Sequence, residues 1–169
     1  MSVRAEVRFT KGADFVVAVA DDDHAERVGK SMLDHGFVLH SLFERTDVPR
    51  IATMRFLLDH VFVDLLTGAC AIEAEVIAES TVLTVFAGRQ CPVASVGALL
   101  ALKALACANR SKPDDAADMQ RLLAVATSVD LATAYQLLAV MEKRTVPGWQ
   151  RIGAIMANAV GFAQADSAT

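Results

Sequence analysis

The hydrophobic pattern of this 169-residue chain changes near Ser95, and this change constrains the fold more than any other feature. Before Ser95, short runs rich in β-branched residues are separated by turn signals, a pattern typical of strands. After it, apolar residues recur at helical spacing, as at Trp149, Ile152 and Met156. The sequence therefore predicts an α+β protein: a mixed β-sheet with flanking helices, followed by a C-terminal helical bundle.

Local signals predict the individual elements. Strands are expected at 14–20, 37–43, 50–58 and 61–66, with a further strand pair in 81–94, and helices at 21–36, 95–109, 113–126, 131–143 and 146–163. Two-residue turns are expected at Asp59–His60 and Ala87–Gly88. In the first helix, Ala25, Val28, Met32 and Leu33 are expected to form the apolar stripe, and Gly36 to end the helix.

Composition excludes several classes of protein. The net charge of −4 argues against a strongly basic, non-specific nucleic-acid binder, although it leaves room for a local basic patch. The three cysteines have no CxxC spacing, which favours reduced thiols, and the histidines have no spacing that predicts a zinc site. No signal-peptide pattern opens the chain, and Lys103 interrupts its longest apolar run. We therefore expect a cytoplasmic protein that does not enter a membrane.

Asp64 is unusual because it lies inside the apolar run VFVDLL, where it shares a strand face with Phe62 and Leu66. A carboxylate there needs a metal, an arginine or several N–H donors to offset its desolvation. The alternative is an aspartate near the strand end, bonded to a nearby loop. Asp14 opens another apolar run, where an acid can also be a solvated edge residue. Gly12 faces the same side as Asp14 and has no side chain.

Lys103 is the second unusual residue, because its neighbours on the helix LLALKALA are apolar or small. Its ammonium either extends to solvent or meets an anion. The alternative for the nearby acids is a solvated helix junction with intrahelical pairs such as Asp118 to Arg121. If Lys103 faces a nucleotide, Lys103→Met should leave stability unchanged or raise it. A loss would instead indicate an ion pair with Asp115 or Asp118.

These motifs occur in an order that resembles the nucleotidyltransferases of the AbiEii toxin group, within the polymerase β-like superfamily. The order is an acid opening a strand, a helix ending in HGF, an acid in VDLL, a lysine in LLALKALA and the segment RSKPDDAADMQRLL. The resemblance covers roughly residues 3–143. It implies a nucleotidyltransferase-like α/β core at 1–94, incomplete at its N-terminus, and a helical C-terminal part of the same domain at 95–169.

The segment around Thr10 departs from the family pattern, which reads R-x-T-x-D-x-D. Here RFTKGAD retains Arg8, Thr10 and Asp14, and Gly12 stands where the first aspartate belongs. The glycine-containing turn that holds nucleotide phosphates in the family is also missing before Gly12. The resemblance therefore implies weak or absent activity, with impaired binding of Mg²⁺ and NTP.

The resemblance implies transfer of a nucleoside monophosphate from an NTP to an acceptor hydroxyl, such as an RNA 3′ end. Asp14 and Asp64 would be the catalytic metal ligands. The residues implied to bind the nucleotide are Thr10, Lys103, Asp115 and Asp118. Lys103 would contact the phosphates, and Asp115 or Asp118 would support that lysine. The alternatives are a non-catalytic binding protein that retains the fold and a small-molecule nucleotidyltransferase of the aminoglycoside type.

The resemblance also implies partners for the chain. These are a nucleotide, an RNA acceptor and an antitoxin protein. The strand at 14–20 has apolar residues on both faces, a pattern that expects cover on both sides of the sheet. An antitoxin could supply this cover, and a homo-oligomer is the alternative.

Overall fold

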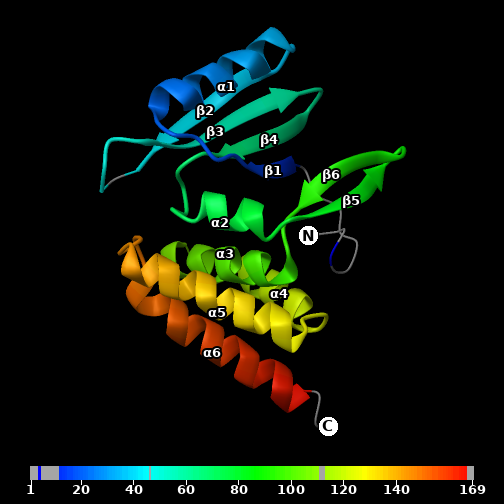
Figure 1. The fold of residues 1–169 in the computed structure, drawn as a ribbon, viewed down its shortest axis with the longest axis vertical. Helices are drawn as coiled ribbons and strands as arrows, with labels where there is room; N and C mark the ends of the chain where they lie inside the picture. The colour runs from blue at the N-terminus through cyan, green and yellow to red at the C-terminus, as the bar shows by residue number, and fades with distance from the viewer. Residues whose placement is uncertain (1–3, 5–11, 46, 111–112, 167–169) are drawn as a thin grey trace. The chain divides into compact units, whose positions relative to one another are not determined.

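The computed structural model describes residues 4, 12–45, 47–110 and 113–166 (Figure 1). The chain divides into two compact units, Phe9–Ile77 and Met1–Arg8 together with Ala78–Thr169. We call them the sheet unit and the helical unit. Among the described residues, none of the helices has both the length and the apolarity needed to cross a bilayer.

The sheet unit is built on a mixed four-stranded sheet. Its elements are β1 (Gly12–Val16), α1 (Asp22–Asp34), β2 (Val38–Glu44), β3 (Ile51–Leu58) and β4 (Val61–Leu66), with α2 (Glu73–Ala78) at the end of the unit. The strand order is β1-β4-β3-β2; β1 pairs with β4 in parallel, and the other pairs are antiparallel. The predicted mixed sheet is confirmed.

The core of the sheet unit lies where α1 packs against the sheet. Ala25 of α1 is buried together with Met54 and Phe56 of β3 and Leu65 of β4, and Val28 and Met32 pack against this cluster. Leu33 is 48% exposed, so its predicted place in the apolar stripe is wrong. One residue along a helix is a rotation of about 100°, which turns Leu33 away from the face that Met32 presents.

Chain reversals occur where the sequence predicts them. Asp59 and His60 both have positive φ, 46° and 68°, and join β3 to β4 as a two-residue turn. Gly36, with φ of 87°, follows the end of α1. The first strand differs from prediction, since β1 ends at Val16 rather than Ala20. Its partner β4 ends at Leu66, which is paired with Val16, and the last bond between the two segments is from the Val17 N–H to the Leu66 oxygen at 2.9 Å.

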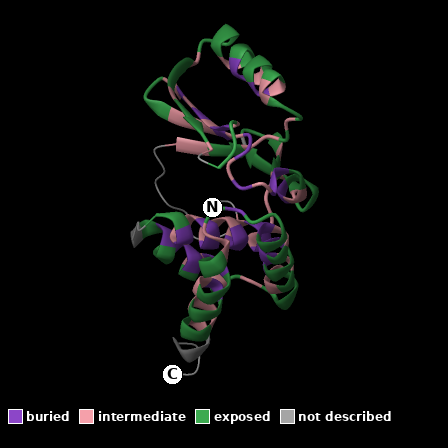
Figure 2. Cartoon of the chain, turned by 90° about the vertical axis from the view of Figure 1, so that its left-hand side faces the viewer, coloured by how far each residue is buried: buried purple, intermediate pink, exposed green. Residues whose placement is uncertain are grey.

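The helical unit begins with the hairpin of β5 (Thr81–Phe86) and β6 (Arg89–Val93), turned at Ala87–Gly88 as predicted. Four helices follow: α3 (Val96–Asn109), α4 (Pro113–Leu123), α5 (Ser128–Lys143) and α6 (Trp149–Asp166). α3 packs against the other three, and the buried residues gather where the helices face one another (Figure 2). The predicted C-terminal helical bundle is therefore confirmed.

The close contact of α3 with α5 depends on Gly97, which has no side chain. A Cβ on Gly97 of α3 would lie 2.4 Å from the backbone oxygen of Asp130 in α5. The backbones of α3 and α5 therefore approach closely at this point. Both helices are capped there: Ser95 Oγ accepts from the Ala98 N–H, and Thr127 with Asp130 forms a capping box.

Candidate functional site

The sheet brings the two predicted acids together. In the parallel pairing of β1 with β4, Asp14 lies directly opposite Asp64, and Gly12 lies opposite Phe62. Residues in register on neighbouring strands project from the same face of a sheet, with the strands about 4.8 Å apart. Two carboxylates are therefore carried close together on one face, and such a pair needs positive charge nearby.

Arg55 supplies that charge from the neighbouring strand. β3 carries Arg55 opposite Asp64, and its Nε and Nη2 donate to Asp64 Oδ1 and Oδ2 at 2.7 and 2.6 Å. The guanidinium carbon lies 5.5 Å from the centroid of the Phe62 ring, which meets His40 edge-on at 5.2 Å. The hydrogen bonds with Asp64, with a smaller contribution from the charge of Asp14, outweigh burial and raise the pKa of Arg55. Of the compensations expected for Asp64, the structure shows an arginine.

The residues present do not fit the two-magnesium centre that the resemblance implies. Both oxygens of Asp64 accept hydrogen bonds from Arg55. A Cβ at position 12 would lie 2.8 Å from the Phe62 backbone oxygen, so an aspartate there would push β1 away from β4. Within the described part of the chain, no group of three or more His, Cys, Asp or Glu residues converges on a point that could hold a metal ion. Gly12 allows the two strands to approach closely.

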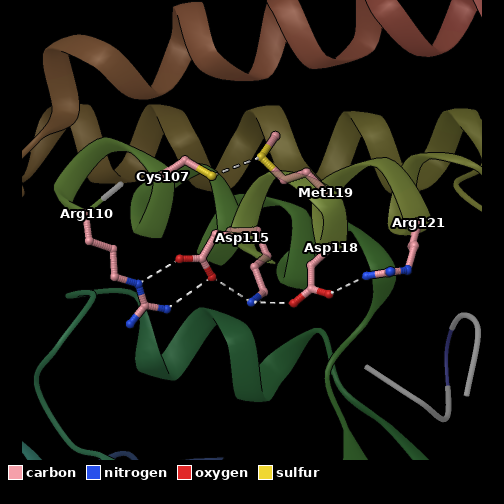
Figure 3. Close-up of polar contacts among 7 residues, drawn as sticks. Cys107, Arg110, Asp115, Asp118, Met119 and Arg121 are labelled. Atoms are coloured by element: carbon pink, nitrogen blue, oxygen red, sulfur yellow. Dashed lines mark hydrogen bonds and ion pairs between the residues drawn. The ribbon is translucent and has the colours of Figure 1, made fainter. Parts of the chain in front are cut away.

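A second group of charges lies between α3 and α4, and Figure 3 shows Arg110, Asp115, Asp118 and Arg121 of this group in a row. The Lys103 ammonium lies 3.0 Å from Asp115 Oδ1 and 2.9 Å from Asp118 Oδ2. Arg110 Nε contacts Asp115 at 2.8 Å, and Arg121 Nη1 contacts Asp118 at 3.2 Å. We call these five residues the ion cluster. Its charges alternate, with the two carboxylates between the three cations.

Burial in the ion cluster differs between the two signs of charge. Asp115 and Asp118 are only 3% and 1% exposed, whereas the side chains of Lys103 and Arg110 are 22% and 52% exposed. The alternative of a solvated junction is therefore wrong for the two acids, although the intrahelical pair of Asp118 with Arg121 is present. Only cations of this cluster reach solvent to any extent.

For Lys103 and Asp115, hydrogen bonding affects the pKa more than burial does. Burial lowers the pKa of Lys103, but hydrogen bonds with Asp118 and Asp115 raise it above the ordinary lysine value. Burial raises the pKa of Asp115, but hydrogen bonds from Arg110 and Lys103 hold it below the ordinary aspartate value. Of the two environments expected for the Lys103 ammonium, solvent or an anion, the structure shows the anion. The anions are the carboxylates of Asp115 and Asp118.

Thr10, like Arg8, lies outside the described residues. Arg55 was missed as a specific residue, although the predicted turn contains the signal that finds it. A two-residue turn at Asp59–His60 pairs Leu58 with Val61, and three residues further along it pairs Arg55 with Asp64.

Comparison with known proteins adds no family to these observations. Neither the models of known protein families nor the curated proteins match this chain. The class of protein is defined by the fold: an α+β protein with a mixed four-stranded sheet and helices, followed by four helices packed together in the described residues.

Proposed function

We propose that this chain is a cytoplasmic nucleotidyltransferase-like protein of the AbiEii toxin type, with weak or no transfer activity of its own. The observation that carries the proposal is the register of β1 and β4, in which Asp14 lies opposite Asp64. The resemblance predicts acids on adjacent strands at this point. Intact proteins of this type would transfer a nucleoside monophosphate from an NTP to an acceptor hydroxyl, such as an RNA 3′ end.

The geometry of the acid pair supports weak rather than full activity. Asp64 is held by two hydrogen bonds from Arg55, and Gly12 has no room for a further carboxylate. We therefore assign no reaction step to a metal ion here. We propose only that the chain retains the fold and a residual capacity to bind the nucleotide.

Lys103 is the group that we propose for contact with nucleotide phosphates. An ammonium has three N–H donors, and the contacts with Asp115 and Asp118 use two of them. The remaining donor can meet a phosphate oxygen while the two carboxylates hold the side chain in place. This arrangement matches the supporting role that the resemblance gives to Asp115 and Asp118.

A second candidate is a non-catalytic binding protein that retains the fold and serves as a protein partner. The closed pair of Arg55 with Asp64 favours it, since the carboxylate is satisfied without any ligand. An antitoxin is the partner that the resemblance implies. This candidate requires no affinity for nucleotides.

Transfer of labelled NTP to an RNA pool in the presence of Mg²⁺, together with NTP binding by equilibrium dialysis, tests the proposal. We expect binding without transfer, or transfer far below the ordinary enzymatic range of about 1–1,000 s⁻¹. NTP binding should be lost in Lys103→Ala and retained in Lys143→Ala, with folding of both checked by circular dichroism.

Two outcomes contradict the proposal in different ways. Transfer at an ordinary rate that survives Asp64→Ala would show that Asp64 carries no chemistry. Complete absence of NTP binding in the folded chain would instead favour the non-catalytic candidate.

A further inference from the structure

We infer that Arg55 is the built-in counter-ion of the acid pair, and that its guanidinium keeps divalent cations away from Asp14 and Asp64. The inference does not rest on nucleotide transfer, because it concerns only how three charges on one sheet face compensate one another. It predicts that removing the guanidinium creates a divalent-cation site that the natural chain lacks.

The strand register places the three charged residues next to one another. Asp14, Asp64 and Arg55 lie side by side on β1, β4 and β3, so the three side chains share one level and one face of the sheet. Neighbouring carboxylates on one face attract either a metal ion or a cationic side chain. Here the cationic side chain comes from the adjacent strand and bonds the central carboxylate, while the charge of Asp14 also acts on it.

The contact of Arg55 with Asp64 uses both oxygens of the carboxylate. A guanidinium presents its N–H donors in a planar fork, and the fork occupies both oxygens of Asp64. A magnesium ion needs oxygen ligands in near-octahedral geometry at about 2.0–2.1 Å. To use Asp64, the ion would have to displace two charge-assisted hydrogen bonds. Because arginine does not lose its proton in proteins, the guanidinium keeps its positive charge at any ordinary pH.

Arg55 also packs against an aromatic ring. The guanidinium lies over the Phe62 ring, and His40 meets the same ring edge-on. The side chain is thus held by a carboxylate on one side and an aromatic ring on another. These two contacts hold the guanidinium toward Asp64 although the Arg55 side chain is 40% exposed.

The sheet unit also contains a matched control. Arg45 donates its Nε to Asp47 Oδ1 at 2.8 Å, and its Nη2 pairs with Asp47 Oδ2. This is the same two-point contact, formed in a loop. In the strand register Asp64 has a second carboxylate directly opposite it. The charge of Glu73 also acts on Arg45, but Glu73 is buried and its Oε1 accepts from the Cys70 N–H. Removing Arg45 should therefore create no comparable cation site.

The test is titration with Mn²⁺ alone, in which electron paramagnetic resonance measures the free ion. We expect Arg55→Gln to gain one site at least about tenfold tighter than any site of the natural chain, as changes around metal ligands typically shift affinity by this much. Arg45→Gln should gain none. Adding Asp14→Asn to Arg55→Gln should remove the new site, and circular dichroism checks that each variant folds.

Two results would overturn the inference. The first is a folded Arg55→Gln chain that binds Mn²⁺ no better than the natural chain. The second needs no arginine variant: it is a Mn²⁺ site in the natural chain that Asp64→Asn abolishes. In that case Arg55 does not close the acid pair.

Discussion

At the scale of single residues, the buried charges of the ion cluster are compensated within the chain. Asp115 and Asp118 each contact Lys103 and one arginine. Removing Lys103 leaves each buried carboxylate with a more exposed arginine as its partner, and weakening the compensation of a buried charge is more costly than losing a surface ion pair. Of the two outcomes that the sequence leaves open for Lys103→Met, the ion pairs with Asp115 and Asp118 favour the loss of stability.

Lys103→Met should lower the free energy of unfolding by about 3–5 kcal/mol, because two buried carboxylates lose a shared partner. Urea unfolding followed by the fluorescence of Trp149 measures this, since the only tryptophan lies in the same unit. Lys143→Met is the control, because Lys143 is exposed in the last turn of α5 and its loss should cost less than about 1 kcal/mol. Equal stability of the two variants would show that the Lys103 contacts contribute nothing.

Acid should weaken the helical unit through Asp115. Its pKa is lowered on folding, so its contribution to stability is present above the unfolded pKa and is lost as the pH falls through the folded value. Stability should therefore fall below about pH 4, with a slope of at most about 1.4 kcal/mol per pH unit from this group. Asp115→Asn should be less stable at pH 6 but lose less between pH 5 and 3. Parallel pH profiles for the two proteins would contradict this origin.

At the scale of elements, the packing of α3 against α5 depends on Gly97. Gly97 is buried where the two helices meet, and Thr133 Cβ as well as the Asp130 oxygen lies within 2.8 Å of the place a Cβ would take. Gly153 of α6 is exposed, with nothing within 4 Å of such a Cβ. The two glycines therefore have opposite consequences for the same substitution.

Gly97→Ala should destabilise the helical unit by about 1–3 kcal/mol, because the added methyl group forces α3 and α5 apart. Gly153→Ala should stabilise it by about 0.5–1 kcal/mol, since alanine restricts the unfolded chain and favours the helix. Urea unfolding of both variants, again followed by Trp149 fluorescence, measures the difference. A gain in stability for Gly97→Ala would show that the helices are not in close contact there.

At the scale of the whole molecule, both units expose large apolar side chains. Those at least 40% exposed include Phe15, Val38, Leu42, Phe43, Val61, Val82, Val129 and Phe162. Single exposed apolar residues are ordinary, but several in one short strand, as in β2, favour association. The homo-oligomer expected from the sequence remains a prediction.

Size-exclusion chromatography with light scattering should find the chain associated rather than monomeric. Deleting the residues after Val146 should increase association, because α6 packs against α3, α4 and α5 and buries Ile152 and Met156. A chain ending at Ala163 keeps these contacts and is the control. A monodisperse natural chain with cooperative thermal unfolding would contradict the prediction.

Except for the short helix α2 (Glu73–Ala78), sequence alone determined the type and order of the elements, because hydrophobic period and turn chemistry are local properties. The alternation of apolar residues predicted the strands, and Asp59–His60 and Ala87–Gly88 marked turns that have positive φ in the structure. Helix ends were also near their predicted places, since Gly36 and Ser95 act through the adjacent backbone.

Only the tertiary structure decided which charges meet and where backbones touch. Lys103 reaches two acids through the packing of α3 against α4, whereas the predicted turn already places Arg55 opposite Asp64. Gly12 resembles an absent ligand in the sequence, yet its lack of a side chain lets β1 approach β4. The physical reason is the same in each case. The free energy of a buried charge or a close contact depends on atoms that other elements bring to it, and local patterning carries no record of them.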